Sequence, residues 1–158
     1  MGELREPLDQ TDCGLPVALE AMGERWSFMI LRAAFNGVHH FEDFLNQLGI
    51  ARNILANRLA RLVEHGIMRR EQMEEDRRKV LYCLTDKGED LLPAMLALRQ
   101  WGEKYGLGVP SNPVLVDKRD ALPIAPISIQ AHDGRSITWH ELQWRDRGEL
   151  GESPEDCC

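Results

Sequence analysis

The chain has 158 residues, and 26 acidic side chains against 19 basic ones give it a net charge of −7 at pH 7. That length supports one hydrophobic core, so we expect one domain with an appendage. No stretch is apolar enough to cross a bilayer and the N-terminus is unlike a signal peptide, which predicts a cytoplasmic protein with no membrane partner.

The first third of the chain predicts a flexible segment followed by three helices. Residues 1–11 are polar and contain a proline, which is typical of a flexible N-terminus. The helices are predicted over residues 15–22, 26–35 and 42–48. Thr11 or Asp12 is the expected N-cap of the first helix and Ser27 that of the second. The second helix is almost wholly apolar, so we expect it in the core, and residues 38–41 are a candidate short strand.

Residues 51–65 form the predicted helix on which the functional interpretation depends. Gly49 supplies the tight turn before it, as in a helix-turn-helix, and Gly66 ends it. Its apolar stripe, with spacings of three and four, is Leu55, Leu59, Leu62 and Val63. Its opposite face is Asn53, Asn57 and Arg61. Asn and Arg have the forked donor geometry that reads base edges in a major groove, so the pattern predicts DNA recognition.

Two β-rich runs follow this helix, at residues 67–73 and 80–84, and residues 74–79 join them through a basic tip. A helix followed by such a hairpin indicates a winged helix. The predicted fold class is mainly α with a small β wing (α+β): a winged helix-turn-helix with a long C-terminal dimerisation helix and a small C-terminal β appendage.

A long helix is predicted from the Thr85 cap to about Tyr105, with Pro93 either tolerated or kinking it. Its apolar residues spread around more of the helix than one core can cover, which favours contact with a second copy of the chain. The residues expected at that dimer interface are Leu15, Leu19, Leu92, Met95, Leu96 and Trp101.

The remainder of the chain predicts an appendage and a tail. Residues 12–106 are the predicted DNA-binding and dimerisation domain, and residues 107–113 a linker. Residues 114–145 contain short β-like runs with a hairpin signal at Asp133-Gly134, which indicates a small β-rich appendage. Residues 146–158 are predicted to be a disordered acidic tail.

Charge is unevenly distributed along the chain. Residues 49–84 carry eight basic and five acidic side chains, a net charge of +3, which leaves −10 for the remainder. An acidic body with one positive face suits a regulator that does not bind all DNA it meets. The alternative, that these arginines are only a solvated surface, stays open on charge alone.

The predicted DNA-binding residues lie on this helix and on the wing tip: Arg52, Asn53, Asn57, Arg58, Arg61, Arg77, Arg78 and Lys79. Two alternatives remain for them. Arg52 or Arg58 could instead pack its stem along the core and pair with a carboxylate. Glu74 and Glu75 could pair with the basic wing residues and weaken their contact with phosphates.

The order and spacing of many residues between Cys13 and Tyr105 resemble the HxlR-type family of winged-helix transcriptional regulators. The matching positions are Cys13, Gly23-Glu24-Arg25-Trp26-Ser27, Ile30-Leu31, Gly37, Phe41, Leu48-Gly49-Ile50-Ala51, Leu55, Arg58-Leu59, Leu62, Gly66, Tyr82, Leu84-Thr85, Gly88, Leu91 and Trp101-Gly102. The resemblance implies a bacterial or archaeal regulator that binds operator DNA as a homodimer. It also implies that the helix over 51–65 enters the major groove while Arg77, Arg78 and Lys79 approach the backbone or minor groove.

The chain departs from this pattern in two places. Many relatives have a proline-rich wing tip, whereas Asp76-Arg77-Arg78-Lys79 looks more like the wing of MarR-type regulators. Relatives with a similar C-terminal extension often carry a Cys-x-x-Cys-Gly, but residues 130–134 contain no cysteine. We therefore expect no metal site and no cofactor.

The four cysteines have no secreted spacing, so reduced thiols are expected. Cys13 stands where the resemblance puts a redox sensor of some relatives, although a small packed residue at the dimer interface is an equal alternative. A small-molecule effector could also lodge near Trp26 and Trp101. No motif indicates an enzyme or catalytic residues. The alternatives to an operator-binding regulator are a winged-helix protein–protein module and a MarR-like ligand-responsive regulator.

Overall fold

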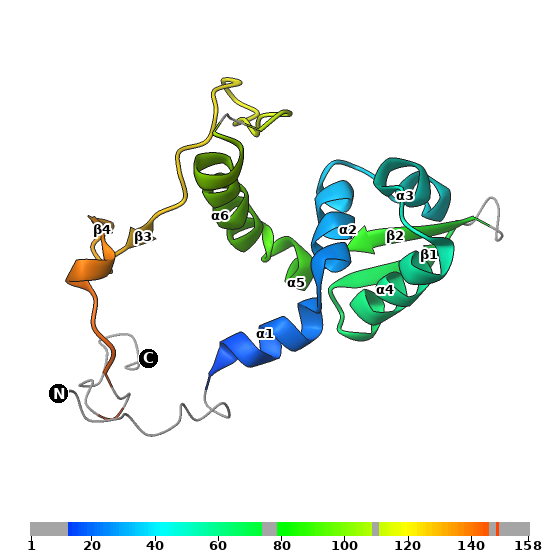
Figure 1. The fold of residues 1–158 in the computed structure, drawn as a ribbon, viewed down its shortest axis with the longest axis horizontal. Helices are drawn as coiled ribbons and strands as arrows, with labels where there is room; N and C mark the ends of the chain where they lie inside the picture. Colours follow the sequence, from blue (N-terminus) through cyan, green and yellow to red (C-terminus); the bar gives the residue numbers. More distant parts are fainter. Residues whose placement is uncertain (1–12, 74–78, 109–110, 146–147, 149–158) are drawn as a thin grey trace. The chain divides into compact units, whose positions relative to one another are not determined.

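The computed structural model describes residues 13–73, 79–108, 111–145 and 148 of the chain (Figure 1). The chain divides into two compact units, Met1–Arg99 and Gln100–Cys158. We call them the N-terminal and C-terminal units and describe each by itself. The division lies within a helix, before the linker predicted at 107–113.

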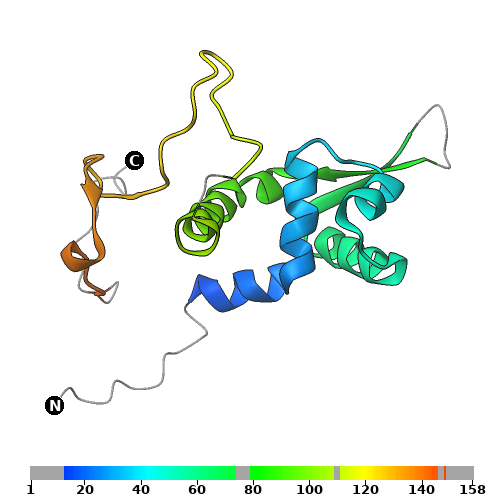
Figure 2. The same cartoon turned by 45° about the horizontal axis from the view of Figure 1, so that its top comes forward.

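The described elements of the N-terminal unit are mainly helical, with one β-hairpin. In chain order they are α1 (Gly14–Met22), α2 (Arg25–Phe35), α3 (Phe41–Leu48), α4 (Arg52–Glu64), β1 (Met68–Gln72), β2 (Val80–Leu84), α5 (Asp86–Glu89) and the greater part of α6 (Leu92–Gly102). This arrangement confirms the predicted fold class, a winged helix-turn-helix with a small β wing (Figures 1 and 2).

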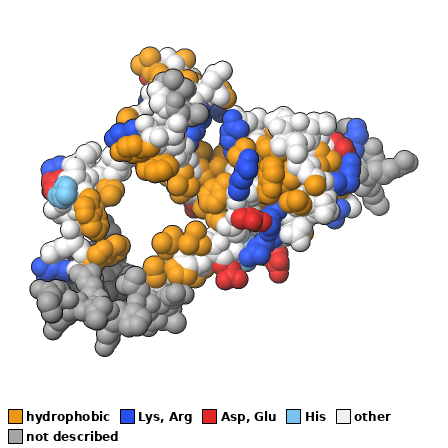
Figure 3. All heavy atoms as spheres, viewed as in Figure 1, with side chains coloured by type: hydrophobic (Ala, Val, Ile, Leu, Met, Phe, Trp, Pro, Cys, Tyr) orange, Lys and Arg blue, Asp and Glu red, His pale blue; other side chains and the backbone are white. Residues whose placement is uncertain are grey.

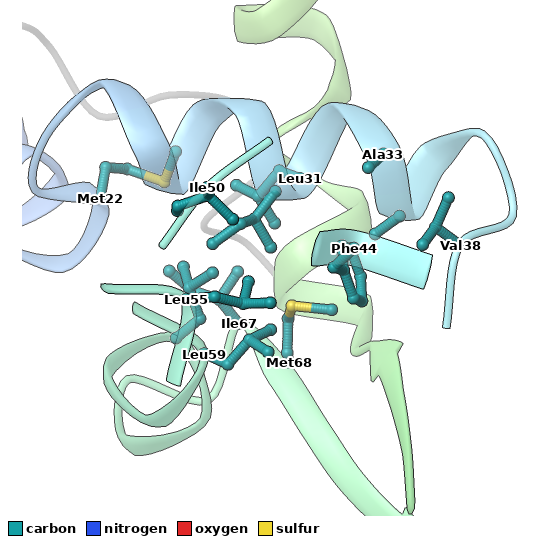
Figure 4. Packing of buried hydrophobic residues seen from close by; sticks show 13 residues of the cluster. Met22, Leu31, Ala33, Val38, Phe44, Ile50, Leu55, Leu59, Ile67 and Met68 are labelled. Atoms are coloured by element: carbon teal, nitrogen blue, oxygen red, sulfur yellow. The ribbon is translucent and has the colours of Figure 1, made fainter. Parts of the chain in front are cut away.

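The hydrophobic core lies between α2, α3, α4 and the base of the hairpin (Figure 4). Its buried members are Met22, Ile30, Leu31, Ala33, Ala34, Val38, Phe44, Ile50, Leu55, Leu59, Leu62, Ile67 and Met68. The predicted stripe of α4 is confirmed at Leu55, Leu59 and Leu62, which are fully buried, while Val63 packs at the edge of the core. The apolar α2 is central, as expected.

Two predicted helix caps are wrong. Glu24 is the N-cap of α2, and Ser27 lies inside the helix, where its own N–H donates to the Glu24 carbonyl, 3.0 Å away. The first turn therefore forms before Ser27, whose side chain is buried. The N-cap of α1 is Cys13, rather than Thr11 or Asp12, which lie outside the described residues.

Two glycines set the ends of α4. Gly49, between α3 and α4, has a φ of 59° in the left-handed region, where a side chain would be strained. Gly66 follows the C-cap His65 with a φ of 68°. The predicted turn and helix end are both confirmed, and they place α4 between the preceding helix and the hairpin.

Strands β1 and β2 form an antiparallel pair in which Met68 lies opposite Leu84 and Gln72 opposite Val80. The predicted strand over 38–41 is reduced to one antiparallel bridge between His40 and Leu81. The bridge forms because the Tyr82 N–H donates to the His39 carbonyl, 2.9 Å away. It ties the hairpin to the start of α3.

The single helix predicted from residue 85 to 105 is instead three segments, α5, α6 and the π-helix η1 (Glu103–Leu107). Thr85 caps α5 as predicted, because its side chain accepts a hydrogen bond from the Gly88 N–H. Pro93 has no N–H to donate to the Glu89 carbonyl, so the helix cannot continue unbroken from α5 into α6.

In the C-terminal unit, β3 (Ile129–Gln130) and β4 (Ser136–Ile137) form the predicted hairpin, followed by the 3₁₀ helix η2 (Trp139–Glu141). Gly134 in the turn has a φ of 81°. The expected run over 114–116 makes only an isolated bridge, from Val116 to Pro123. The described residues of this unit include none that is buried.

Candidate nucleic-acid interface

The exposed face of α4 carries two amides, two alanines and, at the end of the helix, one carboxylate. Its members are all exposed, and each has another member three or four positions away: Asn53, Ala56, Asn57, Ala60 and Glu64. The buried leucines on the other side of the helix hold this face outward. Asn53 and Asn57 are therefore presented at the surface, as the sequence predicted of their positions.

Ala56 and Ala60 are exposed on the same face as Asn53 and Asn57, and they are candidate interface residues that the sequence alone did not indicate. A helix with alanines beside its polar side chains can approach a base edge closely, and a methyl group can contact the methyl of thymine. Their spacing relative to Asn53 and Asn57 was the available signal. That spacing alone does not indicate a contact, because alanine has no polar group and is common in helices generally.

Arg52, in the first turn of α4, pairs with Glu42 of α3. Its Nη2 lies 2.7 Å from Oε1 and 2.9 Å from Oε2, and its guanidinium lies over the Phe41 ring at 5.2 Å from the centroid. Both partners are about two-thirds exposed, at 65% and 64%. An exposed pair of this kind contributes little to stability, so Arg52 can exchange its carboxylate for a phosphate at small cost.

Arg58 and Arg61 are directed toward the turn between α1 and α2. Arg58 forms an ion pair with Glu24, and only 19% of its side chain is exposed. Arg61 donates from Nη2 to the backbone carbonyl of Glu20, 2.7 Å away. The Nε of each arginine is buried and has no hydrogen-bond partner among the described residues.

The β1–β2 hairpin and its connection carry further basic residues. Arg77 and Arg78 lie outside the described residues, and Lys79 is exposed. Arg70, on β1, is also exposed and has no ion pair within the described part of the chain. Its neighbour Arg69 is held by Glu71, which raises the pKa of Arg69, and it donates to the Leu84 carbonyl at 2.6 Å.

The residues predicted at a dimer interface differ in exposure. Leu15 and Leu19 of α1 are 63% and 54% exposed, and Figure 3 shows the hydrophobic side chains that cover α1. Trp101 is 65% exposed, whereas Leu92 and Leu96 are half-buried. Met95 packs against the core of its own chain.

Other predicted chemistry is sparse in the described part of the chain. Cys13 is exposed at the start of α1, and Cys83 is half-buried on β2. No three His, Cys, Asp or Glu side chains of the described residues gather to hold a metal ion. None of the described helices combines the length and hydrophobicity that crossing a membrane requires.

A sequence model of the HxlR-like helix-turn-helix family matches residues 21–108. An uncharacterized HTH-type transcriptional regulator of Mycobacterium tuberculosis is 46% identical over 88 residues, which are 56% of this chain and 56% of that relative. The chain thus spans little more than half the length of this relative. The HTH-type transcriptional regulator YodB of Bacillus subtilis is 28% identical over 89 residues, 56% of this chain and 80% of YodB.

Solved structures share the fold. The crystal structure of the transcription-factor candidate PA1607 has a TM-score of 0.79 and 37% identity, and covers 86% of this chain and 96% of its own. The redox regulator HypR in its reduced form has a TM-score of 0.54 and 28% identity, covering 58% of this chain and 92% of HypR. Since the family model matches more than half of its residues, the chain belongs to the HxlR-like helix-turn-helix family.

Proposed function

We propose that the chain is a transcriptional regulator that binds specific double-stranded DNA sequences as a homodimer. Helix α4 lies in the major groove, and the β1–β2 hairpin approaches the backbone or minor groove beside it. The observation that carries this proposal is the exposed face of α4, which presents Asn53 and Asn57 between alanines while its leucines are fully buried.

In this proposal, the residues that contact bases differ from those that contact phosphates. An asparagine can bond an adenine edge with two hydrogen bonds, so Asn53 and Asn57 select sequence. Arg52, at the entering end of α4, and Lys79, the residue before β2, supply charge for phosphates. Arg70 joins them as an exposed hairpin arginine without a described ion pair. Arg77 and Arg78 keep their predicted role at the wing tip.

The homodimer part of the proposal rests on exposed apolar side chains. Leu15 and Leu19 lie four positions apart on α1 and are more than half exposed, and Val17 is 70% exposed. Burying such side chains against a second copy removes them from water. A two-fold dimer would then read two half-sites separated by about 34 Å or a multiple of it.

The direct test is selection of duplexes from a random-sequence library by the wild-type chain. We expect enrichment of a motif with two related half-sites. Asn57→Ala should relax the preference at one position of each half-site, costing about 1–3 kcal/mol of discrimination. Ala60→Leu should weaken binding to all duplexes, because the longer side chain prevents close approach. Gln130→Ala, which removes an exposed amide from the C-terminal unit, serves as the control.

The rival function, a winged-helix protein–protein module, predicts a different salt response. Phosphate contacts release counterions, so the logarithm of the DNA affinity should fall with the logarithm of salt concentration by about 0.9 per contact. If the wild-type chain enriches no motif and its DNA affinity does not depend on salt, the proposal is wrong and the protein module becomes the better hypothesis.

We further propose a redox effector acting at Cys13, in place of the small-molecule alternative. HypR, which shares the fold, is named a redox regulator, and Cys13 is exposed at the start of α1. The experiment is protection footprinting on the selected duplex with and without oxidant. Wild type should lose or change its footprint on oxidation, and Cys13→Ser should not. An identical response of the two proteins would rule out Cys13 as the sensor.

A further inference from the structure

Two arginines of α4 point away from the exposed face that carries Asn53 and Asn57. We infer that Arg58 and Arg61 are positioning residues that hold α4 against the α1–α2 turn, and that they do not contact DNA. The inference rests on the proposed function, since it assigns these residues a role in placing the DNA-reading helix. For Arg58 it takes up the alternative that the sequence left open, pairing with a carboxylate, and for Arg61 it replaces the predicted DNA contact.

Arg61 completes the C-terminal end of α1. The last four carbonyls of a helix have no partner within it, and Glu20 lies in the last turn of α1. Arg61 donates to the Glu20 carbonyl at 2.7 Å, and α1 has no basic residue of its own in that turn. A cation there also interacts favourably with the helix dipole. The end of α1 is therefore tied to the last turn of α4.

Arg58 holds the other side of the same turn. Its partner Glu24 is the N-cap of α2, one residue after Gly23, where α1 ends with a φ of 69°. The side chain of Arg58 is 19% exposed, whereas that of Glu24 is 60% exposed. Because Glu24 is largely exposed, its carboxylate stays in contact with water while it pairs with Arg58. The ion pair therefore holds Arg58 without burying a second charge.

Direct contact with DNA would require both arginines to leave these partners. Arg58 and Arg61 lie beside the buried Leu62, on the flank of α4 that packs against α1 and α2. The Nε atom of each arginine is buried, so protein already encloses the end of the guanidinium group nearest the side-chain stem. Moving Arg61 outward would break its hydrogen bond to the Glu20 carbonyl and remove its cation from the end of α1. Asn53 and Asn57 face no such penalty.

This connection has a consequence for a dimer. Helix α1 carries Leu15 and Leu19, which we propose face a second copy, and the two arginines fix α1 relative to α4. The angle between these helices then sets the distance between the two α4 helices of a dimer, and hence the spacing of half-sites that it reads. Arg58 and Arg61 would thus influence sequence spacing without touching a base.

The test uses the full chain and a fluorescein-labelled duplex selected from a random library by the wild type. Binding is measured by fluorescence anisotropy across a series of salt concentrations. The variants are Arg58→Met, Arg61→Met, Glu24→Gln and the double variant Glu24→Gln/Arg58→Met. Arg52→Met is the matched control, because Arg52 is an exposed arginine of the same helix with a phosphate role in our proposal.

We expect Arg58→Met, Arg61→Met and Glu24→Gln each to weaken binding about tenfold, the scale of one lost base contact, with an unchanged salt slope. The double variant should be no weaker than either of its single variants, because both remove one interaction. Arg52→Met should lower the slope by about 0.9. Repeating the selection with Glu24→Gln should shift the preferred half-site spacing, which a loss of stability alone would not do.

The inference is overturned if Arg58→Met lowers the salt slope as Arg52→Met does. It is also overturned if Glu24→Gln binds the duplex as tightly as wild type or more tightly. That result is expected if Arg58 contacts DNA, because the substitution would remove a negative charge beside the contact. Should Arg58→Met fail to fold, Glu24→Gln decides alone, since it changes only an exposed side chain. Absence of salt-dependent binding by wild type would instead contradict the proposed function.

Discussion

The two units of the chain are organised by different forces. The N-terminal unit is built around a buried apolar cluster to which helices α1 to α4 and the base of the hairpin contribute. In the C-terminal unit the described residues include none that is buried, and large side chains such as Trp139 and Trp144 are 67% and 83% exposed. Many of its described hydrogen bonds and ion pairs join residues close in the sequence, such as Arg119 and Asp117, although the Ile127 N–H donates to the Gln100 side chain at 2.8 Å.

This difference determines how precisely each unit can hold a functional group. Helix α4 has one orientation because its leucines fit a packed interior, and packed interiors resist small displacements. Turns held by exposed polar groups have far less free energy opposing their opening. The comparison therefore predicts that substitutions in the N-terminal unit change global stability, while those in the C-terminal unit change only local order.

The sharpest challenge to this comparison is Leu59→Ala. Leu59 is fully buried, so its truncation should remove apolar contacts, leave a cavity and lower the free energy of unfolding by about 2–5 kcal/mol. Urea denaturation followed by circular dichroism measures it. Trp144→Ala, in the C-terminal unit, should stay within about 0.5 kcal/mol of wild type despite deleting a larger side chain. Equal losses for the two variants would refute the distinction between the units.

Gly88→Ala tests the junction between α5 and the hairpin. A Cβ on Gly88 would lie 2.2 Å from the Ile67 carbonyl oxygen, which is backbone and cannot rotate away. We expect a loss of about 1–3 kcal/mol from the resulting shift, measured as a lower unfolding midpoint. Gly102→Ala is the matched control, because a Cβ there meets nothing within 4 Å. A stabilised Gly88→Ala protein would show that this junction adjusts freely.

Sequence reasoning was most accurate where a residue's local chemistry allows one arrangement. Leu55, Leu59 and Leu62 could only form one helical stripe, and glycines 49 and 66 occupy positive-φ positions that favour glycine. Thr85 was predicted as a cap from its own side-chain chemistry. These features needed no knowledge of distant residues, and together they define the helix-turn-helix.

The errors arose where distant partners decide the outcome. Ser27 has the chemistry of a cap, but α2 starts earlier and tertiary packing buries it. From the sequence, Pro93 could either be tolerated in the long helix or kink it. Because proline has no N–H to donate, the helix is interrupted there. The sequence left pairing with a carboxylate open for Arg58 as an alternative to DNA contact. The partners of Arg58 and Arg61, Glu24 and Glu20, lie more than thirty positions away, so spacing within α4 alone could not indicate the direction of either side chain.

A smaller effect is expected from Thr85→Ala. The Thr85 hydroxyl donates to the Gly66 carbonyl at 2.6 Å and accepts from the Gly88 N–H at 3.2 Å, which links α5 to the end of α4. Its loss should lower the free energy of unfolding by about 1 kcal/mol. Thr138→Ala removes the corresponding cap of η2 in the C-terminal unit and should leave the global unfolding midpoint unchanged. A lower midpoint for Thr138→Ala would mean that the two units unfold cooperatively.

The smallest expected effect is a local pH dependence in the C-terminal unit. The pKa of Glu141 lies below its ordinary value because the Thr138 N–H donates to its carboxylate at 2.8 Å, with further bonds from the Thr138 hydroxyl and from Arg135. A lowered folded-state pKa means that the carboxylate stabilises η2 above the unfolded pKa. This contribution is lost as the pH falls through the folded value.

Nuclear magnetic resonance can follow this transition at a single site. The amide signal of Thr138 should titrate with a midpoint below the ordinary pKa of glutamate, and Glu141→Gln should abolish the transition. Signals from the core of the N-terminal unit, such as Leu59, should not change over that transition, because the carboxylate of Glu141 is exposed and acts only on its own turn. A Thr138 midpoint above the ordinary glutamate value would show that the capping bonds do not favour the charged carboxylate. Movement of the Leu59 signal with the same midpoint would instead show that this exposed cap is energetically coupled to the packed core.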